Sequence, residues 1–208
     1  MNERRPLASR RTSWASTLLA WLLRTPLSAD AISAAGLVFA ALGAGAMLLA
    51  GDAPWLFLLA ALLIQLRLLA NLMDGLVAVE GGRGSALGPL WNEVPDRAED
   101  AVLLVAFGYA MQASWLGWLC ACLAIGTAYM RQTGAALGLG HDFSGPQAKP
   151  QRMALLTAGC VLASIEAMMR DADPIFLGQT TLALIAIGTA ITLARRLRRL
   201  ARALRAGP

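Results

Sequence analysis

The sequence predicts an all-α integral membrane protein. Its 208 residues are 57% hydrophobic and only 15% charged, with a mean hydropathy of +0.57. These values lie far from those of soluble domains. Apolar runs long enough to cross a bilayer core of ~30 Å recur along the chain, separated by glycine, proline or charged residues. We therefore expect six transmembrane helices that form one membrane domain over residues 1–208.

The expected elements follow one another with short breaks. The spans are placed at 31–50, 54–79, 86–112, 115–138, 152–170 and 174–194. The breaks are placed at 51–54, 81–84, 112–114, 141–150 and 170–174, where glycine, proline or charge ends a helix. Residues 12–24 are too short to span and follow four arginines. They predict an amphipathic helix on the membrane surface, with a signal-peptide core as the alternative.

The positions of the basic residues orient this bundle. Arginines are concentrated at both ends of the chain and in the loops at 80–87 and 139–152. By the positive-inside rule these parts face the cytoplasm, which agrees with an even number of spans. We expect a bacterial-type inner (cell) membrane protein with both termini cytoplasmic. The basic ends are explained as membrane anchors, so no nucleic-acid partner is expected.

The cysteines and the histidine argue against redox or histidine-based metal chemistry. Cys120, Cys122 and Cys160 lie inside apolar runs and are interpreted as reduced packing residues, with the first two on different sides of a helix. His141 lies in a polar loop and has no other histidine to share a metal with.

Amide and acidic side chains repeat at helical spacing in two apolar segments. Asn71 and Asp74 are three residues apart, and Asn92 and Asp96 are four apart, so each pair shares a helix face. The short link predicts a tight antiparallel hairpin over 67–100, with its cytoplasmic ends together. Such groups are costly in a membrane unless a cation or substrate uses them. Their oxygens suit Mg²⁺ or Mn²⁺ bound to a diphosphate, with an active site at the cytoplasmic face.

Small residues on the same hairpin predict a place for a nucleotide. Gly75, Ala78 and Gly88 would let a bulky ligand approach the backbone.

The intervals from Asn71 to Asp96 resemble the signature of the CDP-alcohol phosphatidyltransferase family, D-x2-D-G-x2-A-R-x8-G-x3-D-x3-D. The resemblance implies a metal-dependent enzyme of phospholipid biosynthesis. Such an enzyme moves a substituted phosphate from a CDP-linked lipid donor, here CDP-diacylglycerol, to an alcohol acceptor and releases CMP. It also implies that Asp74 is a metal ligand and that Asp96 is both a ligand and the general base.

Three identities depart from that signature and indicate a variant subgroup. Asn71 and Asn92 replace the first and third aspartates, and Val79 replaces the arginine. An asparagine carbonyl can bind a hard cation but adds no negative charge. The number of metal ions, one or two, is therefore left open.

Nearby acids could return part of the lost charge. Asp100 continues the face of Asp96 by one turn, and Glu80 and Glu99 lie close in sequence. Glu93 would need a helix distortion of the kind that Pro95 could supply.

Cations form the second feature of the sequence. Arg131, Lys149 and Arg152 flank the loop before the last two spans and could bind the phosphate of the acceptor or of the lipid. For Lys149 and Arg152, a topology signal explains the charge equally well. Arg67 precedes Asn71 by one turn and is expected to balance the carboxylates.

Three other interpretations remain open at this point. The acids could be helix-end charges paired with Arg83 and Arg97. The chain could be a catalytically degenerate family member that serves as a membrane scaffold or regulator. It could also be a prenyltransferase, although that chemistry would require two distant aspartate-rich motifs. The acceptor alcohol and a homodimer are likewise left open.

Overall fold

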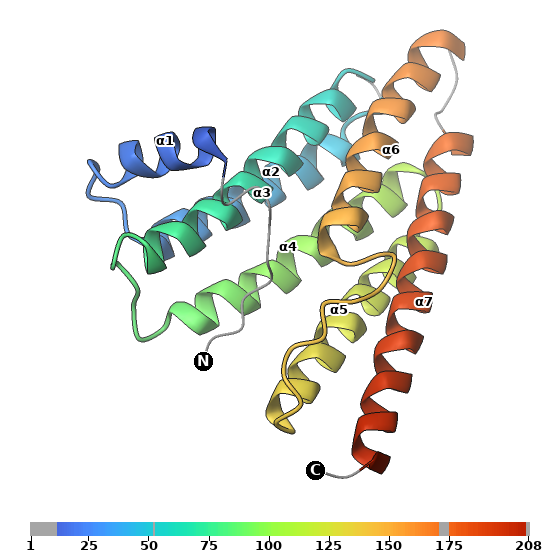
Figure 1. The fold of residues 1–208 in the computed structure, drawn as a ribbon. Helices are drawn as coiled ribbons and strands as arrows, with labels where there is room; N and C mark the ends of the chain where they lie inside the picture. Colours follow the sequence, from blue (N-terminus) through green and yellow to red (C-terminus); the bar gives the residue numbers. More distant parts are fainter. Residues whose placement is uncertain (1–11, 52, 171–174, 207–208) are drawn as a thin grey trace.

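The structure is a computed structural model that describes residues 12–51, 53–170 and 175–206. This part of the chain is helical and contains no strand. The helices, drawn in Figure 1, are α1 (Ser13–Leu22), α2 (Ala29–Leu48), α3 (Leu56–Val79), α4 (Gly88–Ala110), α5 (Ser114–Ala136), α6 (Lys149–Arg170) and α7 (Ile175–Ala206). Each expected span thus corresponds to a helix.

Local chemistry accounts for several helix ends. The Ser28 hydroxyl accepts a hydrogen bond from the Ala31 amide at 3.1 Å and so caps the start of α2. The connection between α4 and α5 turns at Gln112, whose φ is +54°. At this corner the two helices come very close, and a Cβ on Gly108 would lie 2.6 Å from the Cα of Gly117. Glycine at both positions permits this approach.

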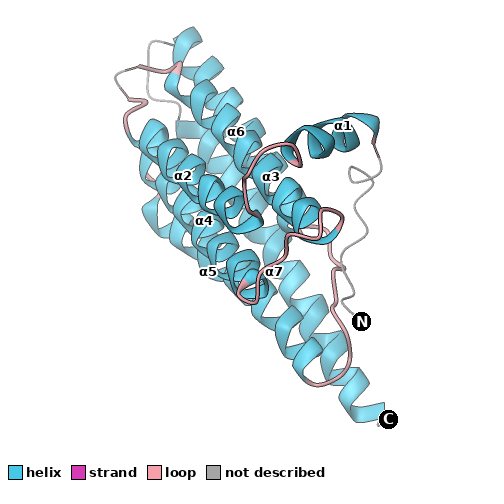
Figure 2. Ribbon diagram, turned by 90° about the vertical axis from the view of Figure 1, so that its left-hand side faces the viewer, coloured by secondary structure: helices cyan, strands magenta, loops and turns pink. Residues whose placement is uncertain are grey.

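The six long helices form a closed ring in the order α2, α3, α6, α7, α5, α4, with each helix packed on its two neighbours (Figures 1 and 2). The short helix α1 packs on α3. This arrangement corrects the prediction of a tight hairpin over 67–100. Helix α2 packs along both α3 and α4, which have little direct contact with each other. Small residues on α2, among them Gly36, Ala40 and Gly43, let it fit between them.

The core is apolar, and so is much of the outer surface. Phe57 of α3 and Phe107 of α4 are fully buried and meet edge to face, with ring centroids 6.4 Å apart. Leucine, isoleucine and tryptophan side chains remain exposed on most helices. Four helices, α2, α3, α6 and α7, are long and apolar enough to cross a membrane. The chain is accordingly an integral membrane protein, while the count of six spans stays a prediction.

Two minor predictions can be compared with the structure. Cys120 and Cys160 are buried, Cys122 is exposed, and all three are free thiols. Helix α1 lies within the stretch 12–24, but its location on a membrane surface stays a prediction. The break at 170–174 falls largely outside the described residues.

Candidate functional site

A cavity of about 620 Å³ lies between five of the long helices, α3, α4, α5, α6 and α7. Polar residues concentrate on its wall within an otherwise apolar bundle. The cavity is lined by Trp14 of α1, Gln65, Leu68, Leu69, Asn71 and Leu72 of α3, Asp96 and Arg97 of α4, Thr127, Ala128 and Arg131 of α5, Phe143 and Ala148 of the loop, Lys149, Pro150 and Arg152 of α6, and Arg196 of α7.

Five of the predicted site residues line this one cavity. They come from four different helices and comprise Asn71, Asp96, Arg131, Lys149 and Arg152. Asp96 and Lys149, which are 53 residues apart in the chain, are therefore brought into direct contact.

The other predicted residues lie elsewhere. Asp74 and Gly75 are buried in α3, Ala78 is half-buried near the end of the same helix, and Gly88 begins α4. None of these four is part of the cavity wall described here. Asn92 belongs to α4, but its side chain lies outside the described residues.

Nitrogen donors surround the Asp96 carboxylate. Its Oδ1 accepts hydrogen bonds from Asn71 Nδ2 and Lys149 Nζ, and its Oδ2 accepts one from Arg97 Nη2 at 3.3 Å. Arg67 Nη2 lies 3.8 Å from Oδ1. The side chain keeps 15% of its surface exposed, so the carboxylate is held firmly yet still faces the cavity.

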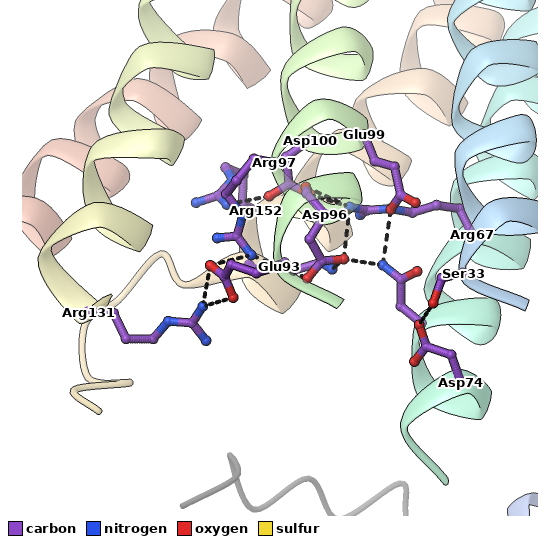
Figure 3. A network of polar contacts seen from close by, with 12 residues as sticks. Ser33, Arg67, Asp74, Glu93, Asp96, Arg97, Glu99, Asp100, Arg131 and Arg152 are labelled. Atoms are coloured by element: carbon purple, nitrogen blue, oxygen red, sulfur yellow. Dashed lines mark hydrogen bonds and ion pairs between the residues drawn. The ribbon is translucent and has the colours of Figure 1, made fainter. Parts of the chain in front are cut away.

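Arg67 is the buried centre of this network (Figure 3). Its side chain has no exposed surface. Nε donates to Glu99 Oε2 at 2.5 Å, and Nη2 donates to Asp100 Oδ1 at 2.6 Å and to the Asp96 carbonyl at 3.3 Å. The expectation that Arg67 balances carboxylates is met in this geometry, mainly through two acids beyond the signature.

Asn71 acts as a hydrogen-bond donor between two acids. Its Nδ2 binds Asp96 and also Glu99 Oε2, at 3.0 Å for the latter. An aspartate in this place could not donate and would add a third carboxylate beside two others. The amide therefore suits its surroundings better than the residue of the signature would.

Helix α2 contributes a glycine to this corner that sequence analysis did not identify. A Cβ on Gly36 would lie 2.9 Å from Asn71 Oδ1 and 3.0 Å from Glu99 Oε1. Only glycine leaves both oxygens in their places. No sequence signal pointed to Gly36, because it lies in a stretch rich in small apolar residues.

Asp74 lies beside the network and not within it. Its Oδ2 accepts a hydrogen bond from Ser33 Oγ of α2 at 2.6 Å. The residue is only 5% exposed, and its Oδ1 is buried without a hydrogen-bond partner. Among the described residues, Asp74 has no ion pair.

The basic side of the cavity is already paired with acids. Arg152 is buried and donates from Nη2 to Asp100 Oδ2 at 2.6 Å. Arg131 Nη2 binds both oxygens of Glu93, at 2.7 and 2.6 Å, and its guanidinium lies 5.5 Å from the centre of the Phe143 ring. Two donors of Arg152, Nε and Nη1, are buried without partners, and they are free to bind an anion.

The interpretation of the acids as partners of Arg83 and Arg97 holds for one arginine. Arg97 lies 3.5 Å from Glu93 and 3.3 Å from Asp96. Arg83 instead donates to the carbonyls of Leu23, Thr25 and Leu27, which fixes the loop after α3 to the end of α1.

The loop before α6 forms part of the wall. Asp142 organises it by accepting a hydrogen bond from the Ser144 amide at 2.8 Å. Partial burial acts to raise the pKa of Asp142, but Ser144 and the nearby Arg199 outweigh it, so the pKa lies below its ordinary value. Arg196 of α7 donates to the Ser144 carbonyl at 3.0 Å and to the Thr127 carbonyl at 2.7 Å.

Arg196 is a cavity residue that sequence analysis assigned to the basic membrane anchor. It is 6% exposed, whereas Arg195 and Arg198 beside it are exposed. Helical periodicity could have separated it from its neighbours, because it continues the buried face of Thr189 and Thr192.

Known proteins resemble this chain in two ways: one relative is similar in part of its sequence, and solved structures share the fold. No family model matches the sequence. The inner membrane protein YnbA of Escherichia coli K12 is 32% identical over 87 residues, which are 42% of this chain and 43% of YnbA. The match thus covers less than half of that curated relative.

Solved structures match over most of the chain. The phosphatidylinositol phosphate synthase PgsA1 of Mycobacterium tuberculosis, with CDP-DAG bound, aligns with a TM-score of 0.70 and 20% identity over 89% of this chain and 92% of its own. The same enzyme in complex with manganese and citrate gives a TM-score of 0.69 and 19% identity, over 88% and 87% of the two chains. This chain has the fold of that synthase.

The donor atoms of the site suit one hard cation better than several. Among the described residues, no three acidic, histidine or cysteine side chains are arranged to hold a metal. Asp74 offers an unpartnered buried oxygen with the Ser33 hydroxyl beside it. Mg²⁺ is commonly held by one or two carboxylates together with water and substrate phosphates. The residues present fit a single ion of this kind.

Proposed function

We propose that this protein is a membrane phosphotransferase of the CDP-alcohol phosphatidyltransferase type. It would transfer a substituted phosphate from a CDP-linked lipid, with CDP-diacylglycerol as the preferred donor, to an alcohol and release CMP in phospholipid biosynthesis. The observation that carries the proposal is the cavity in which Asp96, from the signature segment, faces Lys149 and Arg152 at the start of α6. The spacing from Asn71 to Asp96 and the shared fold support it.

In this proposal Asp96 is the general base. The oxygen of the acceptor hydroxyl attacks the β-phosphorus of the donor, its proton passes to the Asp96 carboxylate, and the bond from that phosphorus to the CMP oxygen breaks. Asn71, Lys149 and Arg97 hold the carboxylate in position by donating to it. Its exposed edge faces the cavity where the acceptor would lie.

A divalent cation, Mg²⁺ or Mn²⁺, would neutralise charge on the diphosphate and on the leaving CMP. Of the predicted ligands Asp74, Asp96, Asn71 and Asn92, Asp74 has the available oxygen, because that of Asp96 is occupied by nitrogen donors. Gly75, Ala78 and Gly88 are proposed to border the nucleotide.

Cations on the opposite wall would bind a phosphate group. Arg152 has two buried N–H donors without partners, and Lys149 and Arg131 lie on the same cavity. Charge-assisted bonds from such groups hold phosphate oxygens well. We assign Arg131, Lys149 and Arg152 to the phosphate of the acceptor or of the lipid, at the cytoplasmic face of a bacterial-type inner membrane.

The test is release of CMP by the purified protein. The protein in detergent micelles is incubated with CDP-diacylglycerol, Mn²⁺ and, separately, glycerol phosphate, inositol phosphate or serine. Alcohol-dependent CMP release would support the proposal and identify the acceptor. A folded protein that releases no CMP with any of these alcohols would contradict it and favour a scaffold or regulator.

A further inference from the structure

The ion pairs around the cavity divide its acids into two groups. Apart from the Arg199–Asp142 pair of the loop, four carboxylates form ion pairs with five cations among the described residues. The acids are Glu93, Asp96, Glu99 and Asp100, and the cations are Arg67, Arg97, Arg131, Lys149 and Arg152. This network carries no excess of negative charge, so it has no electrostatic need for a metal ion.

Arg67 occupies the position from which a cation can reach most of these acids. It is fully buried and touches Glu99 and Asp100 directly, and the Asp96 carboxylate lies 3.8 Å away. A guanidinium remains charged at any accessible pH. The protein thus carries a permanent cation at the centre of its acidic cluster.

Asn71 completes this arrangement because it donates to Asp96 and Glu99. Every oxygen of Asp96 and Asp100 then accepts a hydrogen bond from nitrogen. A divalent ion at these oxygens would have to displace Arg67 or Lys149 and bring two positive charges together.

Asp74 differs from all of them. The residue is only 5% exposed, and its Oδ1 has no side-chain hydrogen-bond partner among the described residues. The Ser33 hydroxyl and the backbone N–H of Gly75 are neutral donors to this carboxylate, and no cation forms an ion pair with it in this part of the chain. A buried carboxylate without a compensating cation is costly. A bound cation would remove this cost, and hydroxyl and carboxylate oxygens are its preferred ligands.

We propose that Arg67 is a built-in cation of this site, so that the protein binds one divalent ion, at Asp74, and not two. The inference rests on the phosphotransferase function proposed above, whose number of metal ions the sequence left open. It explains why Asn71 can stand where the signature has an aspartate. The missing charge is not needed where an arginine already neutralises the cluster.

The number of ions per chain tests this inference directly. Metal-free protein in detergent micelles is dialysed to equilibrium against Mn²⁺ and CDP, and the manganese bound above the buffer level is counted. We expect one ion per chain. Asp74→Asn should lose it, while the control Glu80→Gln, which removes an exposed acid from the same helix end, should retain it.

A second variant addresses Arg67. Arg67→Gln leaves Glu99 and Asp100 without their guanidinium partner, and the folded variant should take up a second ion. Should this variant not fold, the counts for wild type and Asp74→Asn still decide the question.

The results that overturn the inference are distinct from failure of the proposed function. No ion or two ions in the wild type, one ion that persists in Asp74→Asn, or one ion in folded Arg67→Gln would each refute it. Two ions together with CMP release would refute the inference and leave the phosphotransferase intact. One ion at Asp74 without CMP release would support the inference and contradict the proposed phosphotransferase activity.

Discussion

The two halves of the signature look alike in sequence but differ in the structure. Each half places an asparagine one helical turn before an aspartate, Asn71 before Asp74 and Asn92 before Asp96. Asp96 is held by three nitrogen donors and faces the cavity. Asp74 is buried beside two neutral donors, the Ser33 hydroxyl and the Gly75 amide, and its Oδ1 has no side-chain partner among the described residues. The difference teaches that two similar motifs can have different surroundings, and it is the basis on which we propose a general base at Asp96 and a cation site at Asp74.

Removal of the proposed base, Asp96, should have the largest effect on activity. Asp96→Asn should lower CMP release by ~10²–10⁴-fold, because loss of a general base typically has this effect. Thermal unfolding in detergent should show that the variant remains folded. Glu80→Gln serves as the exposed acidic control, and CMP release by Asp96→Asn at the wild-type rate would remove Asp96 from this role.

Removal of Arg67 tests how much its ion pairs with Glu99 and Asp100 stabilise the protein. Arg67→Met should reduce the free energy of unfolding by about 3–5 kcal/mol, since it leaves two buried carboxylates uncompensated. The matched control is Arg97→Met, whose ion pairs are partly exposed and should contribute at most about 1 kcal/mol. Equal effects of the two substitutions on thermal unfolding would show that Arg67 is not the centre of the network.

Asn71→Asp tests the donor role of Asn71, because the two side chains have nearly the same shape. The substitution removes a donor to Asp96 and Glu99 and adds a like charge beside them. We expect a loss of about 1–3 kcal/mol in the free energy of unfolding. Chemical denaturation measured beside wild type would check this, and a more stable variant would indicate that the position still prefers the aspartate of the signature.

The smallest predicted effect lies on the basic wall. Arg131→Met should raise the KM for a phosphate-bearing acceptor by about 10-fold and change the KM for the CDP donor much less, because a charge-assisted contact to one ligand is lost. Steady-state kinetics with both substrates varied would separate the two. An equal rise in both KM values would indicate general damage to the cavity.

Much of this architecture could be predicted from the sequence because its signals are periodic. Six apolar runs predicted the six long helices. The expected convergence of the signature residues is observed for Asn71 and Asp96, which share a hydrogen bond, although α3 and α4 do not form the expected hairpin. Arg131 lies on the cavity, as a charge within an apolar helix suggested.

The contribution of α2 could not be predicted, because its site residues carry no distinguishing pattern. Ser33 and Gly36 lie among alanines and look like ordinary packing residues. Their role depends on α2 packing between α3 and α4, a tertiary arrangement that the short loop of the hairpin seemed to exclude. The pairing of Glu99 with Arg67 likewise depends on which helix faces lie opposite each other.

The most direct test of the two roles is a crystal structure with Mn²⁺ and CDP-diacylglycerol, in which anomalous scattering locates every manganese ion. The two-role account predicts one peak per chain, next to Asp74 Oδ1, with Arg67 and Lys149 still bound to their acids. A second peak between Asp96 and Glu99, with either cation displaced, would contradict it.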